Sequence, residues 1–136
     1  MKRVVKVIGV LILLLITGCG EKERLFIEDI VEERDGPYSQ GVETHRIKYG
    51  SGGLKIGGYL VIPKDIEGKL PVIIYNRGGN RNYGLIDKNL NHLEYLASNG
   101  YIVLASQYRG NIYSEGRDEY GGGDVDDIKP GDNFSR

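Results

Sequence analysis

The sequence predicts an α/β fold in which an antiparallel hairpin is followed by a parallel βαβ unit. Residues 45–49 and 54–62 each alternate apolar and polar side chains, and a glycine-rich turn at 50–53 joins them. This is the pattern of two half-buried strands in a hairpin. Further along, two apolar runs at 72–75 and 101–105 flank an amphipathic stretch. Strand, helix and strand in this order form a right-handed crossover between parallel strands.

The elements of the crossover are predicted in turn. The apolar run 72–75 stands next to turn signals, which favours a strand buried on both faces. A helix is expected over 87–98, with Asp87 as its N-cap and Gly100 in the left-handed position that follows its end. One apolar stripe at helical spacing consists of Leu90, Leu93, Leu96 and Ala97. His92 lies beside this stripe and is expected to face solvent.

Two polar loops leave the ends of the predicted parallel strands. The first, 76–84, contains the adjacent Gly78 and Gly79, where backbone can approach a ligand closely. Ligands of open α/β sheets bind outside the carboxyl ends of the strands, although a plain strand-to-helix turn is the alternative. The second, 106–123, is rich in tyrosine, arginine and acidic residues, and loops of this length are usually functional or disordered. A helix start with Asp124 as N-cap follows it and is interrupted at Pro130.

The amino-terminal segment is predicted to be a lipoprotein signal. A basic region at 2–6 and an apolar run at 7–16 precede Ile16-Thr17-Gly18-Cys19, which resembles a bacterial lipobox. We therefore expect a signal peptide at 1–18, a tether at 19–42 and the folded domain at 43–136. Acylated Cys19 would bind membrane lipid and hold the protein at the extracytoplasmic face of the cell membrane. An ordinary signal peptide or short anchor that happens to carry a cysteine is the alternative.

Composition excludes several classes of function. Removing residues 1–18 takes away three basic residues, which leaves 15 basic against 19 acidic and a net charge of −4. This charge gives no support to nucleic-acid binding. Cys19 is the single cysteine, so no intrachain disulfide forms. The acidic residues between 118 and 127 lack the spacing of a calcium loop, and no metal or cofactor is expected. His45 is expected at the strand surface without a partner.

Four motifs in order resemble the first part of an α/β-hydrolase domain of the prolyl-oligopeptidase type. They are LKIGGYLVIPK at 54–64, PVIIYNRGGN at 71–80, ASNGYIVLASQYRGN at 97–111 and YGGGDVDDI at 120–128. The resemblance implies the N-terminal part of an α/β-hydrolase sheet, incomplete in this chain. In the intact family this domain hydrolyses peptides or esters.

The resemblance also implies roles for individual residues. Arg77, Gly78 and Gly79 occupy the place where the family forms part of its oxyanion hole. Arg77 stands where the family usually has histidine or tyrosine, and Asn80 where proline is frequent. Arg109 and either Asp124 or Asp127 are similar to the family's structural polar residues, and we expect an arginine–carboxylate contact that braces the loop.

The family's nucleophile and base are missing from this sequence. No G-x-S-x-G segment occurs, and no histidine follows His92, so a serine–histidine pair in the family's order is absent. We expect a chain truncated before the nucleophile and inactive alone. The alternative is a non-catalytic surface lipoprotein that binds a ligand through the two loops. The sequence defines neither the substrate nor an oligomeric state.

Overall fold

The computed structural model describes residues 25–79 and 83–128. The predicted signal segment, Cys19 and Pro130 lie outside the described residues. Within the described part, no helix is both long and apolar enough to cross a membrane.

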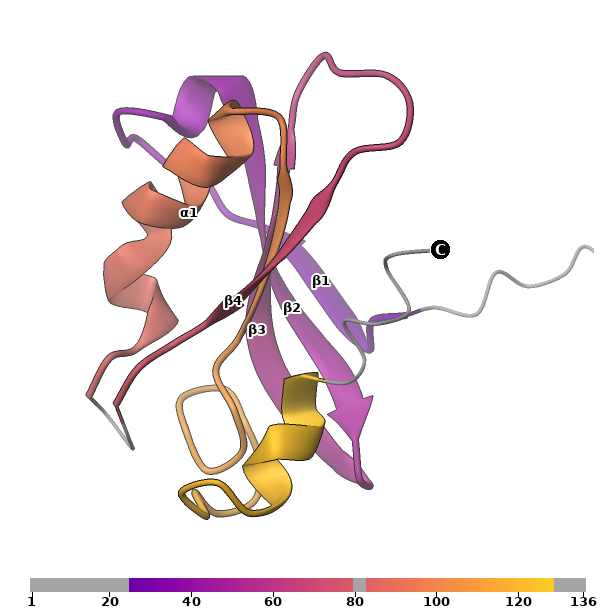
Figure 1. The fold of residues 1–136 in the computed structure, drawn as a ribbon, viewed down its shortest axis with the longest axis vertical. Coiled ribbons are helices and arrows are strands. Elements are labelled where there is room, and N and C mark those ends of the chain that lie inside the picture. Colours follow the sequence, from indigo (N-terminus) through magenta and orange to yellow (C-terminus); the bar gives the residue numbers. More distant parts are fainter. Residues whose placement is uncertain (1–24, 80–82, 129–136) are drawn as a thin grey trace, which may run out of the picture.

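One mixed sheet organises the domain. Its five strands are β1 (Glu28–Val31), β2 (Val42–Ser51), β3 (Leu54–Pro63), β4 (Val72–Asn76) and β5 (Ile102–Ser106). Their order is β1-β2-β3-β5-β4, with β4 and β5 parallel and the other pairs antiparallel. The helix α1 (Leu90–Ser98) covers one face of this sheet (Figure 1). The predicted arrangement, an antiparallel hairpin followed by a parallel βαβ unit, is confirmed.

The alternation in β3 separates two apolar clusters. Tyr59 and Val61 pack with Leu93 and Ala97 of α1 in the first cluster. Ile56 and Leu60 belong to the second cluster, on the other face of the sheet. The period-two pattern of 54–62 therefore gives both faces of one strand an apolar lining, and the hairpin predicted from it is present with Ser51 paired to Leu54.

The start of the crossover helix differs from the prediction. A 3-10 turn, η2 (Ile86–Asn89), precedes α1, so Asp87 does not cap the α-helix. Asp87 Oδ1 instead accepts a hydrogen bond of 2.8 Å from Nε2 of Gln107, a residue buried completely just after β5. The Asp87 carboxylate thus bonds to the side chain of Gln107 in place of the backbone N–H groups at the start of α1. At the other end Gly100 has a φ of +91° and its N–H donates to Ala97 O, as predicted.

Strand β4 is less buried than the sequence predicts. It is the outermost strand beyond β5 in the described sheet, and Ile74 is 36% exposed. The prediction of a strand buried on both faces is wrong for 72–75 and fits β5, in which Val103, Leu104 and Ala105 are buried. Apolar character alone cannot distinguish an outer strand from a central one, because strand order depends on long-range pairing.

Part of the range predicted to be a tether, 19–42, is integral to the fold. Residues 28–31 form β1, and a 3-10 turn, η1 (Ser39–Gly41), leads into β2. Between them, Arg34 Nε donates to Oε1 of Glu94 on α1 at 2.8 Å, and Glu94 is fully buried. Residues 28–42 of the range predicted to be a tether are therefore part of the folded domain.

Polar side-chain contacts accompany the pairing of β1 with β2. They are the ion pairs Glu28–Lys48 at 3.5 Å and Glu32–Arg46 at 3.3 Å, and a hydrogen bond of 2.7 Å between Asp29 Oδ1 and Nδ1 of His45. The strand itself buries little, since Ile30 is 38% and Val31 54% exposed. The expectation that His45 has no partner is wrong, because β1 supplies its carboxylate. His92 is exposed, as predicted.

Candidate functional site

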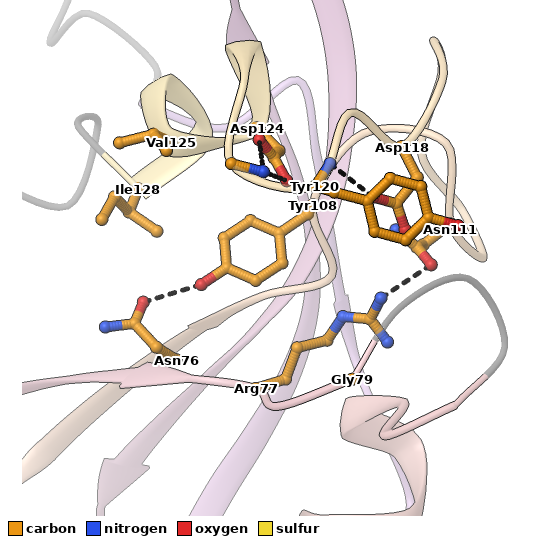
Figure 2. Close-up of a pocket in the computed structure, with 11 residues that line it drawn as sticks. Asn76, Arg77, Gly79, Tyr108, Asn111, Asp118, Tyr120, Asp124, Val125 and Ile128 are labelled. Carbon is orange, nitrogen blue, oxygen red and sulfur yellow. Dashed lines mark hydrogen bonds between the residues drawn. The ribbon is translucent and has the colours of Figure 1, made fainter.

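A cavity of about 280 Å³ lies where β4 and β5 end (Figure 2). Three segments form its walls: the end of β4 with the turn after it, the loop that follows β5, and a 3-10 turn at 123–128. Its lining residues are Asn76, Arg77, Gly79, Tyr108, Asn111, Asp118, Tyr120, Gly121, Asp124, Val125 and Ile128. The carboxyl ends of parallel strands are the usual ligand position in open α/β sheets.

The turn after β4 requires glycine at two positions. Gly79 has a φ of +85°, and a Cβ there would lie 2.6 Å from the Tyr83 carbonyl oxygen. Gly84 has a φ of +74°, and its Cβ would collide with the Gly78 carbonyl. Backbone segments therefore approach each other without room for side chains. Gly79 lines the cavity, whereas Gly78 lies beside it, and the oxyanion role of both stays a prediction.

Arg77 joins the two loops at the cavity. Its side chain is 6% exposed. Nη1 donates to Tyr83 O at 3.0 Å, and Nη2 donates to Oδ1 of Asn111 at 2.7 Å (Figure 2). Burial lowers the pKa of Arg77 below its ordinary value, but a guanidinium stays charged at neutral pH. These contacts give Arg77 a bracing role that the sequence did not reveal, alongside the predicted contribution to an oxyanion hole.

Tyr108 connects the ends of the two parallel strands. Its hydroxyl donates to Oδ1 of Asn76 at 2.9 Å, and its backbone N–H donates to Oγ of Ser106 at 3.0 Å. The Arg77 guanidinium carbon lies 6.0 Å from the centre of the tyrosine ring. Burial raises the pKa of Tyr108, so the phenol is a neutral hydrogen-bond donor at physiological pH.

The arginine–carboxylate contact expected from the sequence is present. Arg109 donates from its backbone N–H to Asp127 Oδ2 at 2.8 Å and from Nη2 to Oδ1 at 2.9 Å. Asp127 is 1% exposed, and its carbonyl oxygen lies 2.7 Å from Oη of Tyr49. This set of contacts fastens the 3-10 turn at 123–128 to the loop after β5 and to the hairpin.

Asp124 differs from its predicted role. Its carboxylate accepts from the N–H of Gly121 at 3.0 and 3.1 Å. The Asp124 carboxylate therefore bonds to a residue that precedes it in the chain, and both residues line the cavity. The turn that follows is 3-10 rather than α-helical in the described residues. The N-cap prediction at Asp124 is wrong, because this local turn satisfies the carboxylate first.

Sequence reasoning did not identify Asn76, Asn111, Tyr108 or Tyr120 as lining residues. The signal that could have found them is the density of tyrosine and amide side chains after each apolar run. Their convergence depends on the register that places Asn76 beside Ser106. That register brings the first residues of both loops to the same edge of the sheet.

The lining of the cavity is rich in polar residues but does not contain the nucleophile and base of a serine hydrolase. Among its lining residues, all within the described ranges, there is no serine, cysteine or histidine. No cluster of three or more histidine, cysteine or acidic side chains suited to a metal ion occurs in the part of the chain that the structure describes. Hydrogen bonds join four pairs of lining residues to each other: Arg77 with Asn111, Tyr108 with Asn76, Tyr120 with Asp118, and Gly121 with Asp124. The walls are therefore preorganised for binding.

The chain is similar in sequence to known hydrolases. A model of the acetyl xylan esterase family (AXE1) matches residues 20–131. A protein of Bacillus subtilis (strain 168) described as "uncharacterized peptidase YtmA" is 36% identical over 99 residues, which are 72% of this chain and 37% of that protein. The chain thus spans 37% of the length of this curated relative.

Solved structures are also similar to part of the chain. The acetyl xylan esterase from Paenibacillus sp. R4 is 29% identical, with a TM-score of 0.49, over 68% of this chain and 29% of its own. Brefeldin A esterase, described as a bacterial homologue of human hormone-sensitive lipase, is 23% identical with a TM-score of 0.50 over 74% of this chain and 28% of its own. At this level of identity the second likeness concerns the fold alone.

Proposed function

Because the chain belongs to the acetyl xylan esterase (AXE1) family, we propose that its cavity is the oxyanion side of a serine-hydrolase site that acts on esters or peptides. One observation carries the proposal. Gly79, in a left-handed conformation that only glycine adopts easily, lines a preorganised cavity at the carboxyl ends of β4 and β5. Family membership supports an ester, and the relative described as a peptidase supports a peptide.

The role of this chain in such a reaction is electrostatic. When a serine oxygen adds to the acyl carbon, the carbonyl oxygen becomes negatively charged. Backbone N–H groups of the turn at 78–79 would donate hydrogen bonds to that oxygen, and loss of one such donor costs about 3 kcal/mol of transition-state stabilisation. The buried positive charge of Arg77 at the same wall would favour the same charge development.

The serine and its base have to come from outside this sequence. Neither a G-x-S-x-G segment nor a histidine after His92 occurs in it, and nucleophile activation needs both partners in hydrogen-bond reach. We therefore propose that the chain binds the acyl group but does not hydrolyse it alone. A fluorophosphonate probe and an aryl acetate should give no labelling and no turnover with the full chain, and labelling would contradict this.

A chimera tests the oxyanion role. Residues 1–128 of this chain, joined to the remaining length of the Bacillus subtilis relative, should hydrolyse p-nitrophenyl acetate. Gly79→Ala places a Cβ 2.6 Å from Tyr83 O and forces the turn to shift, so kcat should fall about 100-fold or more. Gly53→Ala is a matched control, since Gly53 also has a left-handed φ of +81° but no atom lies within 4 Å of its Cβ position.

Equal loss in both glycine variants would show that backbone strain, not the oxyanion turn, lowers activity. A folded chimera that leaves the ester untouched would refute the hydrolase proposal. If the chimera is inactive while the full chain still binds esters, the non-catalytic binding module becomes the better account, and the preorganised cavity without a nucleophile is what favours it.

Membrane anchoring through Cys19 is a separate part of the proposal. Its support is the order of a basic region, an apolar run and Ile16-Thr17-Gly18-Cys19. Expression in a bacterium with an alkyne-labelled fatty acid should label the wild-type chain and place it in the membrane fraction. Cys19→Ala should abolish both. Labelling that survives the substitution would exclude Cys19 as the acylated residue.

A further inference from the structure

Three tyrosines have backbones in the left-handed region. The φ angles are +61° at Tyr108, +63° at Tyr113 and +53° at Tyr120. A bulky residue rarely adopts this conformation, because Cβ approaches the following carbonyl oxygen. Strained positions of this kind concentrate at ligand clamps and active sites. Tyr108 and Tyr120 both line the cavity, whereas Tyr113 does not.

Local bonds hold both cavity tyrosines in place. The Tyr120 N–H donates to Oδ1 of Asp118 at 3.2 Å, and the next residue, Gly121, donates to Asp124. The Tyr108 N–H donates to Oγ of Ser106 at 3.0 Å. The turn at Tyr120 is therefore built by its neighbours, and the tyrosine side chain is not required to form it.

The Tyr120 ring gains little from the fold. It is 60% exposed at the cavity, so core packing does not compensate for its strained backbone. Glycine or asparagine would adopt the same φ at lower cost. The side chain therefore has a use other than stability, and Figure 2 shows it at the same cavity as Tyr108.

We propose that Tyr108 and Tyr120 determine specificity by stacking on a neutral ring in the bound ligand. This rests on the proposed function, in which the ring belongs to the alcohol or amine portion of the substrate. A cavity of about 280 Å³ is at the small end for ligand sites, which suits a single ring. The side-chain amides of Asn76 and Asn111 at its wall provide hydrogen bonds for polar ring substituents.

Saturation-transfer NMR on the full chain tests the inference with two probes that carry different rings. Phenyl acetate presents an aromatic ring, and methyl β-D-xylopyranoside presents a sugar ring. We expect at least one probe to bind in the wild-type chain. Tyr120→Asn, which keeps a residue tolerant of positive φ but removes the ring, should weaken that binding at least fivefold. Tyr113→Asn makes the same change outside the cavity and should alter it less than twofold.

Stability measurements complete the test. Urea unfolding of Tyr120→Asn should give a midpoint equal to or above that of the wild type, because the substitution relieves a strained backbone. Tyr113→Asn also removes the ring that lies 4.8 Å from the Arg46 guanidinium carbon, so its urea transition serves to show that this control variant is folded. Unchanged probe binding in Tyr120→Asn would overturn the inference, and so would binding of neither probe to the wild type. If Tyr120→Asn and Tyr113→Asn weakened probe binding equally, the cause would be a change in loop conformation and not the loss of a stacking ring. An inactive chimera with intact ring binding would refute the hydrolase proposal alone.

Discussion

Replacing Arg77 by methionine tests whether the cavity loops depend on one buried guanidinium. The variant keeps a long apolar stem but removes the donors to Tyr83 O at 3.0 Å and to Asn111 Oδ1 at 2.7 Å. Hydrogen bonds to charged groups contribute about 1.5–3 kcal/mol each, and Oδ1 of Asn111, a residue that is 7% exposed, is left without the donor that Arg77 supplied. We expect a loss of about 3 kcal/mol in the free energy of unfolding.

Urea unfolding followed by circular dichroism measures this loss. With a slope of about 2 kcal/mol per molar urea, the midpoint should fall by about 1.5 M. Arg46→Met is the control, because its ion pair with Glu32 is 28% and 30% exposed and its guanidinium carbon lies 4.8 Å from the centre of the Tyr113 ring. Each of these two contacts contributes at most about 1 kcal/mol at a partly exposed position. A midpoint for Arg77→Met no lower than that of Arg46→Met would refute the reasoning.

A double-variant cycle separates the pair from its surroundings. Asn111→Leu removes the acceptor of the Arg77 side chain, together with the bond from Nδ2 of Asn111 to the Arg109 carbonyl. In the Arg77→Met/Asn111→Leu double variant the bond between the two side chains is lost only once, so the loss of stability should be smaller than the sum of the single losses by about 1.5 kcal/mol. Additive losses would show that the two side chains act independently.

Two further predictions concern pH and salt. Burial raises the pKa of Tyr49, Tyr59 and Tyr108, so the folded chain keeps protons that unfolded tyrosines release above about pH 10. Stability should be full below about pH 10 and fall as the pH rises further, with a shallower fall in Tyr49→Phe; a urea midpoint that stays level between about pH 9 and 11 would contradict this. The ion pairs Glu28–Lys48 and Glu32–Arg46, which join β1 and its next residue to β2, are partly exposed, and about 1 M salt shortens the screening length to about 3 Å. Amide hydrogen exchange should therefore accelerate in 28–31 relative to β5 as salt rises, and equal rates at all salt concentrations would mean that backbone bonds alone hold β1.

The sequence by itself determined the elements whose cause is local. Period-two alternation at 45–49 and 54–62 with a glycine turn between them predicts a hairpin, and β2 and β3 form it. Apolar runs around a helical stripe, with Gly100 after it, produced the βαβ crossover. The motif order placed an arginine–carboxylate contact after β5, and Arg109 with Asp127 makes it. Each of these depends on neighbours along the chain or on one short motif.

Only the tertiary structure decided the features that depend on distant partners. β1 is a strand because β2 supplies its hydrogen bonds and the lysine that pairs with Glu28. The four residues 28–31 do not by themselves predict a strand. Asp87 does not cap α1, because its carboxylate accepts a hydrogen bond from Gln107, which follows β5. The cavity has its walls because the register of β4 against β5 sets Asn76 beside Ser106, so that Arg77 meets Asn111 and Tyr108 meets Asn76. Periodicity specifies which face of a strand is apolar, but strand order and register depend on pairing between segments far apart in the chain.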